Sequence, residues 1–161
     1  MVTEYLKEGQ AMDILLLIYL LTLSLSAGLY FVFSNTIMAA LNDLGKESAT
    51  SAMRQINRVI QNPIFLSIFA GPLLLGSILS WYHLSANKNS AGLWILASLL
   101  TYFLGVFLVT ILANVPMNNR LEASDKGSYW QDYLKNWTRF NTLRYLACLL
   151  SLTLAILGIL G

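Results

Sequence analysis

Charged residues are scarce in this 161-residue sequence: Asp, Glu, Lys and Arg make up 11%, against 57% hydrophobic residues. A soluble domain contains about 25% charged residues, so the class of soluble proteins is excluded. The net charge of +2 excludes a nucleic-acid-binding protein, which would carry a basic stripe. Histidine and cysteine occur once each, as His83 and Cys148, so no His-rich metal site, haem ligand pair or internal disulfide can form. We therefore expect no metal ligands and no cofactor.

Four long stretches of the chain contain no formal charge. They lie between Asp13 and Asp43, Arg58 and Lys88, Lys88 and Arg120, and from Tyr145 to Gly161. Crossing a bilayer takes about 20 apolar residues, so each of the first three stretches holds one helix and is too short for two. The last stretch becomes long enough when its helix starts at Phe140. The sequence therefore predicts an all-α, four-transmembrane-helix bundle, a single integral membrane domain over 1–161 with spans near 14–38, 63–84, 92–114 and 140–160.

The basic residues are distributed unevenly around these spans. With four spans, both termini and the short turn at 85–91 lie on one side, where Lys7 and Lys88 are the only basic residues. The two longer connections on the other side contain the remaining eight of the ten Lys and Arg. The positive-inside rule therefore places both long connections in the cytoplasm and both termini outside, as in a bacterial inner-membrane protein.

Both long connections have a helical pattern. From Ser48 to Asn62 the apolar residues repeat at helical spacing and the polar residues occupy the other face, which predicts an amphipathic interfacial helix between spans 1 and 2. After the turn at Pro116 the second connection reaches Tyr129 and then continues into the fourth span without Gly or Pro. We expect one long helix with a cytoplasmic extension of span 4.

A weak internal repeat accompanies this layout. A shift of about 79 residues aligns Asn35 with Asn114 and Asn62 with Asn141, which puts an asparagine at the cytoplasmic end of every span. The pattern favours two parallel hairpins related by an axis along the membrane normal. The alternative is that asparagine is simply common at helix ends.

Polar side chains near membrane depth mark a functional site by default, and here they gather at the cytoplasmic helix ends. On the last helix, one face carries Trp130, Tyr133, Trp137, Asn141 and Arg144. An aromatic belt with a snorkelling arginine is one interpretation. A belt keeps its rings at one depth, whereas Trp130 to Trp137 climb about 10 Å along the helix. A stacking wall for a flat aromatic ligand fits this stripe better.

Four segments carry a resemblance to a known family. They are F-V-F-S-N-T-I-M-A-A-L (31–41), A-M-R-Q-I-N-R-V-I-Q-N-P (52–63), N-V-P-M-N-N-R-L (114–121) and W-x2-Y-x3-W-T-x-F-N-x2-R (130–144). With these segments the chain resembles the anthrone oxygenase-like membrane proteins over nearly its whole length from Tyr19. It departs from the family at Ala39, where proline is frequent, and at Thr142, where histidine is frequent.

The resemblance implies oxidation of an anthrone to an anthraquinone with O₂ and without a cofactor. An anthrone enolate is electron-rich enough to react with O₂, so the protein needs a flat slot, a route for one proton and groups that hold the oxyanion. The candidates for the oxyanion are Arg144, Asn141, Asn114 and Arg58. The candidates for substrate binding are Trp130, Tyr133, Trp137, Asn35, Gln55, Asn62 and Asn118. The sequence identifies no general base.

A function from another class also fits the pattern. A non-catalytic membrane protein would use the same residues to bind a quinone-like or lipid ligand, or a partner helix. An enzyme needs a proton acceptor within reach of its ligand, whereas a binding protein does not. A transporter is disfavoured, because no span contains an interior carboxylate for proton coupling. None of these patterns fixes an oligomeric state.

Overall fold

The computed structural model describes residues 2–87 and 90–160, and this part of the chain is helical with no strand. Segments labelled η are π-helical turns within or at the ends of longer helices. The elements in chain order are α1 (Val2–Val32), η1 (Phe33–Ile37), α2 (Met38–Asp43), α3 (Lys46–Val59), α4 (Pro63–Tyr82), η2 (His83–Asn87), α5 (Ser90–Tyr102), η3 (Phe103–Leu108), η4 (Thr110–Asn114), α6 (Val115–Ala123) and α7 (Trp130–Leu160).

Four of these helical stretches are long and apolar enough to cross a membrane. They are Gly9–Asp43, Pro63–Ser85, Ser90–Ala123 and Trp130–Leu160. Each predicted span lies inside one of them, so the predicted all-α bundle with four transmembrane helices is confirmed. The stretches extend past the predicted boundaries because the helical backbone continues into the polar residues that flank the apolar core. The chain is therefore an integral membrane protein. Lys88, which the predicted orientation uses, lies outside the described residues.

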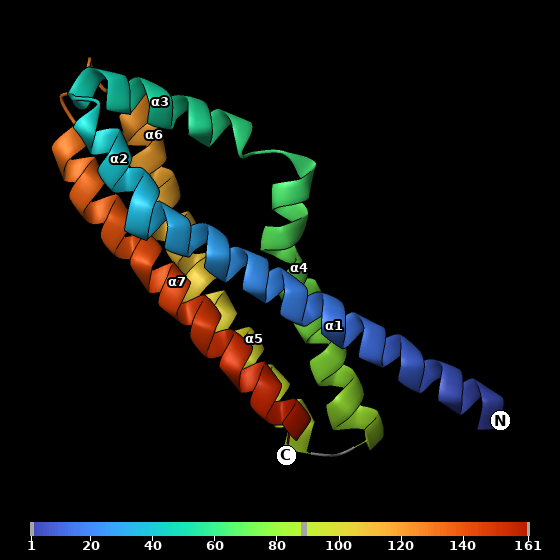
Figure 1. Cartoon of the computed structure of the whole chain (residues 1–161). Coiled ribbons are helices and arrows are strands. Elements are labelled where there is room, and N and C mark those ends of the chain that lie inside the picture. Colours follow the sequence, from blue (N-terminus) through green and yellow to red (C-terminus); the bar gives the residue numbers. More distant parts are fainter. Residues whose placement is uncertain (1, 88–89, 161) are drawn as a thin grey trace.

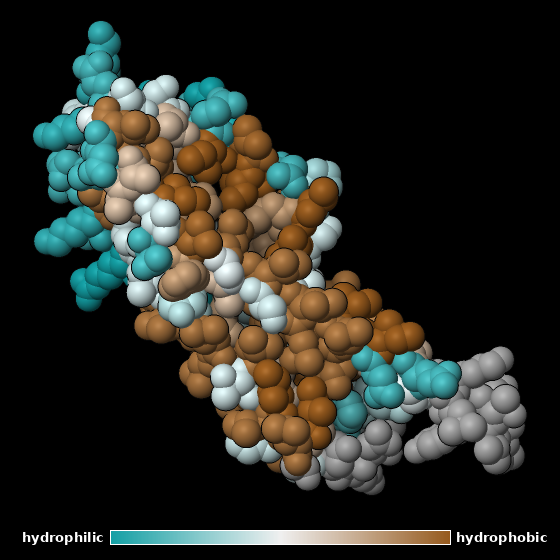
Figure 2. All heavy atoms as spheres, viewed as in Figure 1, coloured by the Kyte–Doolittle hydropathy of each residue, from teal (hydrophilic) through white to brown (hydrophobic). Residues whose placement is uncertain are grey.

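The four long helices form a closed ring of neighbours: α1 packs on α7, α7 on α5, α5 on α4 and α4 on α1. Figure 1 shows both chain ends at one end of this bundle and α3 at the opposite end, which we call the α3 end. In the view of Figure 2, hydrophilic residues concentrate at the α3 end and hydrophobic residues cover the middle of the molecule. Buried hydrogen bonds between the hydroxyls of Tyr19 and Ser98 (2.7 Å) and between those of Ser98 and Ser151 (2.9 Å) connect α1, α5 and α7 inside the ring.

The amphipathic helix between spans 1 and 2 is present as α3, which runs across the end of the bundle opposite the chain termini (Figure 1). Its apolar face is buried at Ala49 and Met53. The prediction extended it to Asn62, whereas α3 ends at Val59. The difference has a local cause, because Asn62 is the N-cap of α4, where its side chain accepts a hydrogen bond from the Phe65 amide (3.0 Å) and Pro63 follows at the first helical position.

The predicted extension of the fourth span is also present, because α7 runs without a break from Trp130 to Leu160. The two halves of the chain nevertheless differ in detail. Asn62 starts a new helix, whereas Asn141, its counterpart in the repeat, lies inside α7. Asn35 is exposed, whereas its counterpart Asn114 is 1% exposed. The internal repeat stays a prediction.

Helix α4 departs from the packing of the other three spans near the α3 end. It contains Pro72 in its interior, and it bends along its length (Figure 1). Proline removes one backbone hydrogen bond and kinks a helix, which explains the bend. Among the described residues α4 packs on α1 and α5, and no comparable packing joins it to η4 or α6. The first turns of α4 therefore stand apart from α6.

Candidate functional site

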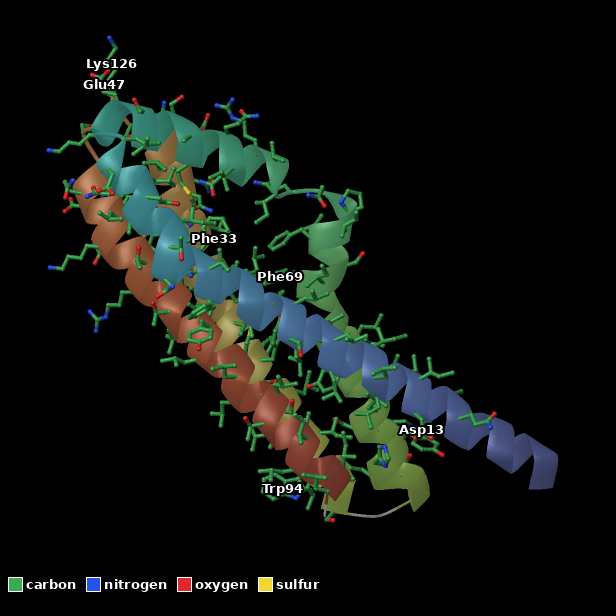
Figure 3. All side chains as sticks on the ribbon, viewed as in Figure 1. Asp13, Phe33, Glu47, Phe69, Trp94 and Lys126 are labelled. Carbon is green, nitrogen blue, oxygen red and sulfur yellow. The ribbon has the colours of Figure 1, made fainter. Side chains whose placement is uncertain are left out.

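A cavity of about 360 Å³ lies below α3, between α1, η1, α4, η4, α6 and α7. Figure 3 labels two of the side chains that line it, Phe33 from η1 and Phe69 from α4. Its volume falls at the lower end of the range of small-molecule sites, which are mostly apolar with a few placed polar groups. The polar residues that line it are Asn57, Gln61, Thr110, Asn114, Asn118, Asn119, Asn141 and Arg144.

Arg144 is the charged residue of this cavity. Its side chain is 5% exposed, and its guanidinium carbon lies 4.3 Å from the centroid of the Tyr30 ring and 5.5 Å from that of Trp137. It donates hydrogen bonds from Nη2 to Asn141 Oδ1 (2.6 Å) and from Nη1 to Thr110 Oγ1 (3.2 Å). Of the described residues that line the cavity, none is an Asp or Glu. A buried cation is normally paired, so this one favours a negatively charged oxygen nearby.

Asn141 holds Arg144 in place and connects α7 to the first span. Its Nδ2 donates to the Tyr30 carbonyl oxygen (2.6 Å) and to Ser34 Oγ (2.7 Å), and its Oδ1 accepts from Arg144. Both hydrogens of the amide are therefore used within the protein. Asn141 was expected among the oxyanion-binding residues, whereas its hydrogen bonds join it to Arg144, Ser34 and the Tyr30 backbone.

Asn114, on the third span, also lines the cavity, but its side chain has fewer hydrogen bonds than that of Asn141. It is 1% exposed, and its Nδ2 makes one long hydrogen bond to the Trp137 carbonyl oxygen (3.4 Å). Its Oδ1 is buried without a partner, as is Arg144 Nε. Buried polar atoms almost always have hydrogen-bond partners. Asn114 and Arg144, which both line the cavity, therefore supply one unpaired acceptor and one unpaired donor in its wall, and neither atom is open to a water-sized molecule.

The aromatic stripe on α7 is a continuous stack. The Trp130 and Tyr133 ring centroids are 5.9 Å apart at 29°, and those of Tyr133 and Trp137 are 5.8 Å apart at 26°. Only Trp137 lines the cavity, whereas Trp130 and Tyr133 are 0% exposed in the core beneath α2 and α3. The expected ligand-stacking wall of three rings is therefore reduced to Trp137, because the apolar face of α3 covers the other two.

Asn118 orients this stack from α6. Its Oδ1 accepts hydrogen bonds from Tyr133 OH (2.8 Å) and from Trp137 Nε1 (2.8 Å). An indole nitrogen is only a donor, so the contact with Trp137 fixes which end of the amide is oxygen. Asn118 also lines the cavity, as the sequence analysis expected, and its Nδ2 makes no hydrogen bond within the described part of the chain.

Besides Trp130 and Tyr133, four further predicted site residues do not line the cavity. Asn35 is exposed, and its amide donates to Thr36 Oγ1 (3.3 Å). Gln55 lies on the exposed face of α3. Arg58 is on the surface and forms an ion pair with Glu122 (2.6 Å). Asn62 is exposed and serves as the N-cap of α4. Gln55 and Arg58 are exposed because α3 turns its apolar side inward, whereas Asn62 is used as a helix cap and Asn35 lies on the exposed side of η1.

Two residues that the sequence analysis did not single out are important for the geometry. Tyr30 supplies the ring beneath the Arg144 guanidinium. Arg54 ties α3 to the end of α6, because its Nε (3.0 Å) and Nη2 (2.8 Å) donate to the Leu121 carbonyl oxygen and its Nη2 also donates to the Ser124 carbonyl oxygen. Tyr30 has the same helical spacing as the core residues Leu23 and Ala27, so its pattern is that of an ordinary core position.

Metal ligands do not cluster in the part of the chain that the structure describes. No group of three or more His, Cys, Asp or Glu side chains there could hold an ion. The polar groups that meet in the cavity are amides, a hydroxyl and a guanidinium. Such groups are suited to hydrogen bonding with oxygen atoms of an organic ligand.

These features define the class: a membrane protein with four helices and an amide- and arginine-lined cavity at one end of its bundle. Residues 65–154 match the sequence model of the family described as anthrone oxygenase, and the match covers more than half of the chain. The chain belongs to the anthrone oxygenase family, as its motifs predicted. The matched range contains Asn114, Trp137, Asn141 and Arg144. No curated protein and no solved structure is significantly similar to the chain.

Proposed function

We propose that this protein is a cofactor-independent membrane oxygenase that acts on an anthrone- or hydroquinone-like aromatic molecule. The observation that carries the proposal is the buried Arg144 guanidinium, which lines the cavity without an acidic partner among the described lining residues. Membership of the anthrone oxygenase family supports the same reaction. The arginine would hold the negative oxygen that forms when the substrate loses a proton.

The reaction balances with O₂ as the oxidant. The substrate CH₂ group loses one proton and becomes an enolate, whose negative charge lies largely on the ring oxygen. The enolate carbon is oxidised as it forms a C–O bond to O₂, giving a hydroperoxide once a proton is taken up. The O–O bond then breaks while the second C–H proton leaves, which yields the ketone and one water molecule. Two hydrogens and two oxygens are conserved between CH₂ plus O₂ and C=O plus H₂O.

The residues of the cavity have separate roles in this scheme. Phe33 and Trp137, with ring centroids 5.7 Å apart, provide an apolar aromatic surface for a flat ring system. Arg144 binds the oxyanion, and Asn141 positions Arg144. Asn114 Oδ1, which has no partner, accepts a hydrogen bond from an O–H group of the substrate or of the hydroperoxide.

Proton removal is assigned to water or hydroxide. The described lining residues include no Asp, Glu, His or Lys that could serve as a base. Gln61 and Asn119 are exposed residues of the cavity wall, so water reaches it from the α3 end. By stabilising the enolate, Arg144 makes the substrate a stronger acid, so that a weak base is sufficient.

The test is O₂ consumption by the purified protein in lipid vesicles with anthrone as substrate. Wild type should exceed the spontaneous oxidation rate, and Arg144→Ala should lower the enzymatic rate by about 100-fold, as the loss of an oxyanion donor typically does. Arg144→Lys should restore only part of it, because an ammonium lacks the planar fork of donors. Arg139→Ala is the matched control, since Arg139 is exposed on the same helix. A wild-type rate equal to the spontaneous rate would overturn the proposal.

A non-catalytic binding protein for a quinone-like or lipid ligand is the second candidate. The specific observation in its favour is the lack of a side-chain base among the described lining residues. Binding of anthraquinone to the wild type, together with anthrone oxidation no faster than in empty vesicles, would decide for this function. The partner-helix form of this hypothesis is less well supported, because the cavity lies inside the bundle below α3.

We further propose that the chain acts as a single domain in a bacterial inner membrane, with the α3 end in the cytoplasm. The basic side chains favour this orientation, because eight of the ten Lys and Arg lie in or beside the two long connections, and Figure 3 places one of them, Lys126, at the α3 end. A Lys126→Cys variant should react with a membrane-impermeant maleimide only after the cells are permeabilised. Labelling of intact cells would show that the α3 end lies outside, which contradicts the proposed orientation.

A further inference from the structure

We propose that the ligand reaches the cavity from the bilayer, through an opening between the first turns of α4 and the η4–α6 segment. The inference rests on the proposed function for the kind of ligand, and it narrows the substrates to flat, largely apolar aromatics that dissolve in the membrane in their neutral form. We call the gap between Leu66 on α4 and Val115 on α6 the side opening.

Helix α4 lacks close packing on one side of the cavity. Near the α3 end this helix is not packed against η4 or α6 in the described structure, although both sides contribute to the cavity wall. Phe65 and Leu66 line the cavity from α4, and Val115 lines it from α6. The bend at Pro72 separates these first turns from the part of α4 that packs in the ring. On this side of the cavity the backbones of α4 and of η4–α6 are therefore held apart, and side chains from both elements line it.

The edge of the cavity is apolar between α4 and α6 and polar at the α3 end. Leu66 is 49% exposed and Val115 is 41% exposed, and both belong to stretches that are long and apolar enough to cross a membrane, so the edge of the cavity between them is apolar. The polar rim residues Gln61 and Asn119 are also exposed, at the α3 end. The cavity therefore has an apolar side and a polar side. A ligand with an apolar ring system enters on the apolar side. To enter between Gln61 and Asn119 it would first have to leave the membrane for water, which is unfavourable.

A ladder of four phenylalanine rings leads from the cavity wall to the third span; Phe65 and Phe69 line the cavity, whereas Phe103 and Phe107 are not among its described lining residues. The centroids of Phe65 and Phe69 are 6.0 Å apart, those of Phe69 and Phe107 5.6 Å, and those of Phe107 and Phe103 5.8 Å, all at small interplanar angles. Tyr102 OH also donates to the Phe69 carbonyl oxygen (3.0 Å). These contacts hold α4 to the third span at Phe69. Phe65, one turn before Phe69, stacks on the Phe69 ring, so aromatic surface continues from the third span to the cavity wall.

The positive charge of the cavity lies deep in its wall, on Arg144. Arg144 is buried on α7, away from the exposed rim residues, and it is the charged member of the described cavity wall. An anion would lose its hydration on the way through lipid, which is strongly unfavourable. A neutral keto form has no such penalty and ionises only next to Arg144. The route and the chemistry therefore select the same molecules.

The first part of the test needs no catalysis. Nitroxide labels at Leu66→Cys and Val115→Cys, in a Cys148→Ala chain in vesicles, should collide more often with O₂ than with a water-soluble nickel chelate. Labels at Leu74→Cys and Leu112→Cys, on the same spans and 65% and 71% exposed, serve as lipid-facing controls. Adding anthraquinone to the membrane should lower the O₂ collision rate at least twofold at 66 and 115 and leave 74 and 112 unchanged. Preferential collision with nickel, or no effect of anthraquinone, would overturn the proposal.

The second part of the test uses activity. Leu66→Trp combined with Val115→Trp narrows the side opening and should lower the oxidation rate of membrane-dissolved anthrone at least tenfold. Leu74→Trp combined with Leu112→Trp should stay within twofold of wild type. An unchanged rate in the first double variant would contradict the route. If the wild type itself does not oxidise anthrone, the proposed function fails, while the label measurements still decide the route.

Discussion

At the residue scale, the guanidinium of Arg144 is held by two hydrogen bonds and two aromatic rings and yet has no carboxylate beside it in the described structure. Asn141 and Thr110 accept its hydrogen bonds, and the Tyr30 ring lies 4.3 Å below it. Isolated buried charges are unfavourable, so such a site is retained at the expense of stability. An oxyanion in the cavity would supply the missing partner.

Asn141→Ala should both destabilise the protein and reduce its activity. The variant loses the hydrogen bonds to the Tyr30 carbonyl and Ser34 and releases Arg144, which should lower the free energy of unfolding by about 1–3 kcal/mol. Thermal denaturation in detergent and anthrone-dependent O₂ uptake measure the two effects. Asn136→Ala is the control, because Asn136 is exposed on the same helix. Equal behaviour of the two variants would show that Asn141 does not position Arg144.

Part of the site was predictable from the sequence at this scale. Trp137, Asn141 and Arg144 share a helix face, and one helix with a known period places them together. Asn35 and Asn62 were predicted to join them because they lie at comparable depths, but depth does not determine the direction in which a side chain points. That direction depends on how the neighbouring helices pack, which a single sequence does not record.

At the element scale, α3 forms the wall of the cavity that faces away from the chain termini, and its attachment depends on Arg54. The donors of this side chain satisfy the carbonyl oxygens of Leu121 and Ser124 at the end of α6. The last carbonyls of a helix need such partners. The exposed ion pair of Arg58 with Glu122 contributes less, because water screens it.

Arg54→Ala should therefore loosen α3 more than Arg58→Ala does. We expect the first variant to lose about 1.5–3 kcal/mol, as for hydrogen bonds to a charged group, and the second less than about 1 kcal/mol. Hydrogen exchange of the backbone amides in 46–59 should accelerate in Arg54→Ala and remain close to wild type in Arg58→Ala. The opposite order would mean that the surface ion pair attaches α3.

The contact between the third and fourth spans depends on a small residue. A Cβ atom added at Gly105 would collide with Ala147 Cβ, whereas one added at Gly28 would meet nothing within 4 Å. Gly105→Val should push these spans apart and lower the free energy of unfolding by about 1–3 kcal/mol, and Gly28→Val should have little effect. Thermal unfolding of both variants in the same detergent compares them directly. Equal melting temperatures would contradict the close packing.

The helices themselves were predictable because their signals are local. The charge-free stretches form the four long helices, and the amphipathic segment forms α3. The stretch without Gly or Pro after Tyr129 forms one continuous helix with the fourth span. The bend of α4 and the gap beside α6 were not predicted. Pro72 marks a place where a helix can bend, but the direction of the bend is set by the helices around it.

At the scale of the whole molecule, the ring of four spans is closed in its middle and open near the α3 end. Tyr19, Ser98 and Ser151 fill the closed part with hydrogen-bonded side chains. The cavity occupies the open part, bordered by α3 and by the bent α4. This division puts the cavity at the end of the bundle where α4 packs on fewer neighbours.

The central claim is that Arg144 stabilises the anion of the bound aromatic molecule. The most direct measurement is a titration of anthrone ionisation by absorbance, in vesicles from which O₂ has been removed. With wild-type protein, bound anthrone should ionise at a pH about one to two units below that of anthrone in empty vesicles. With Arg144→Ala this difference should disappear, and with Arg139→Ala it should persist. Identical titrations for the wild type and Arg144→Ala would contradict the account.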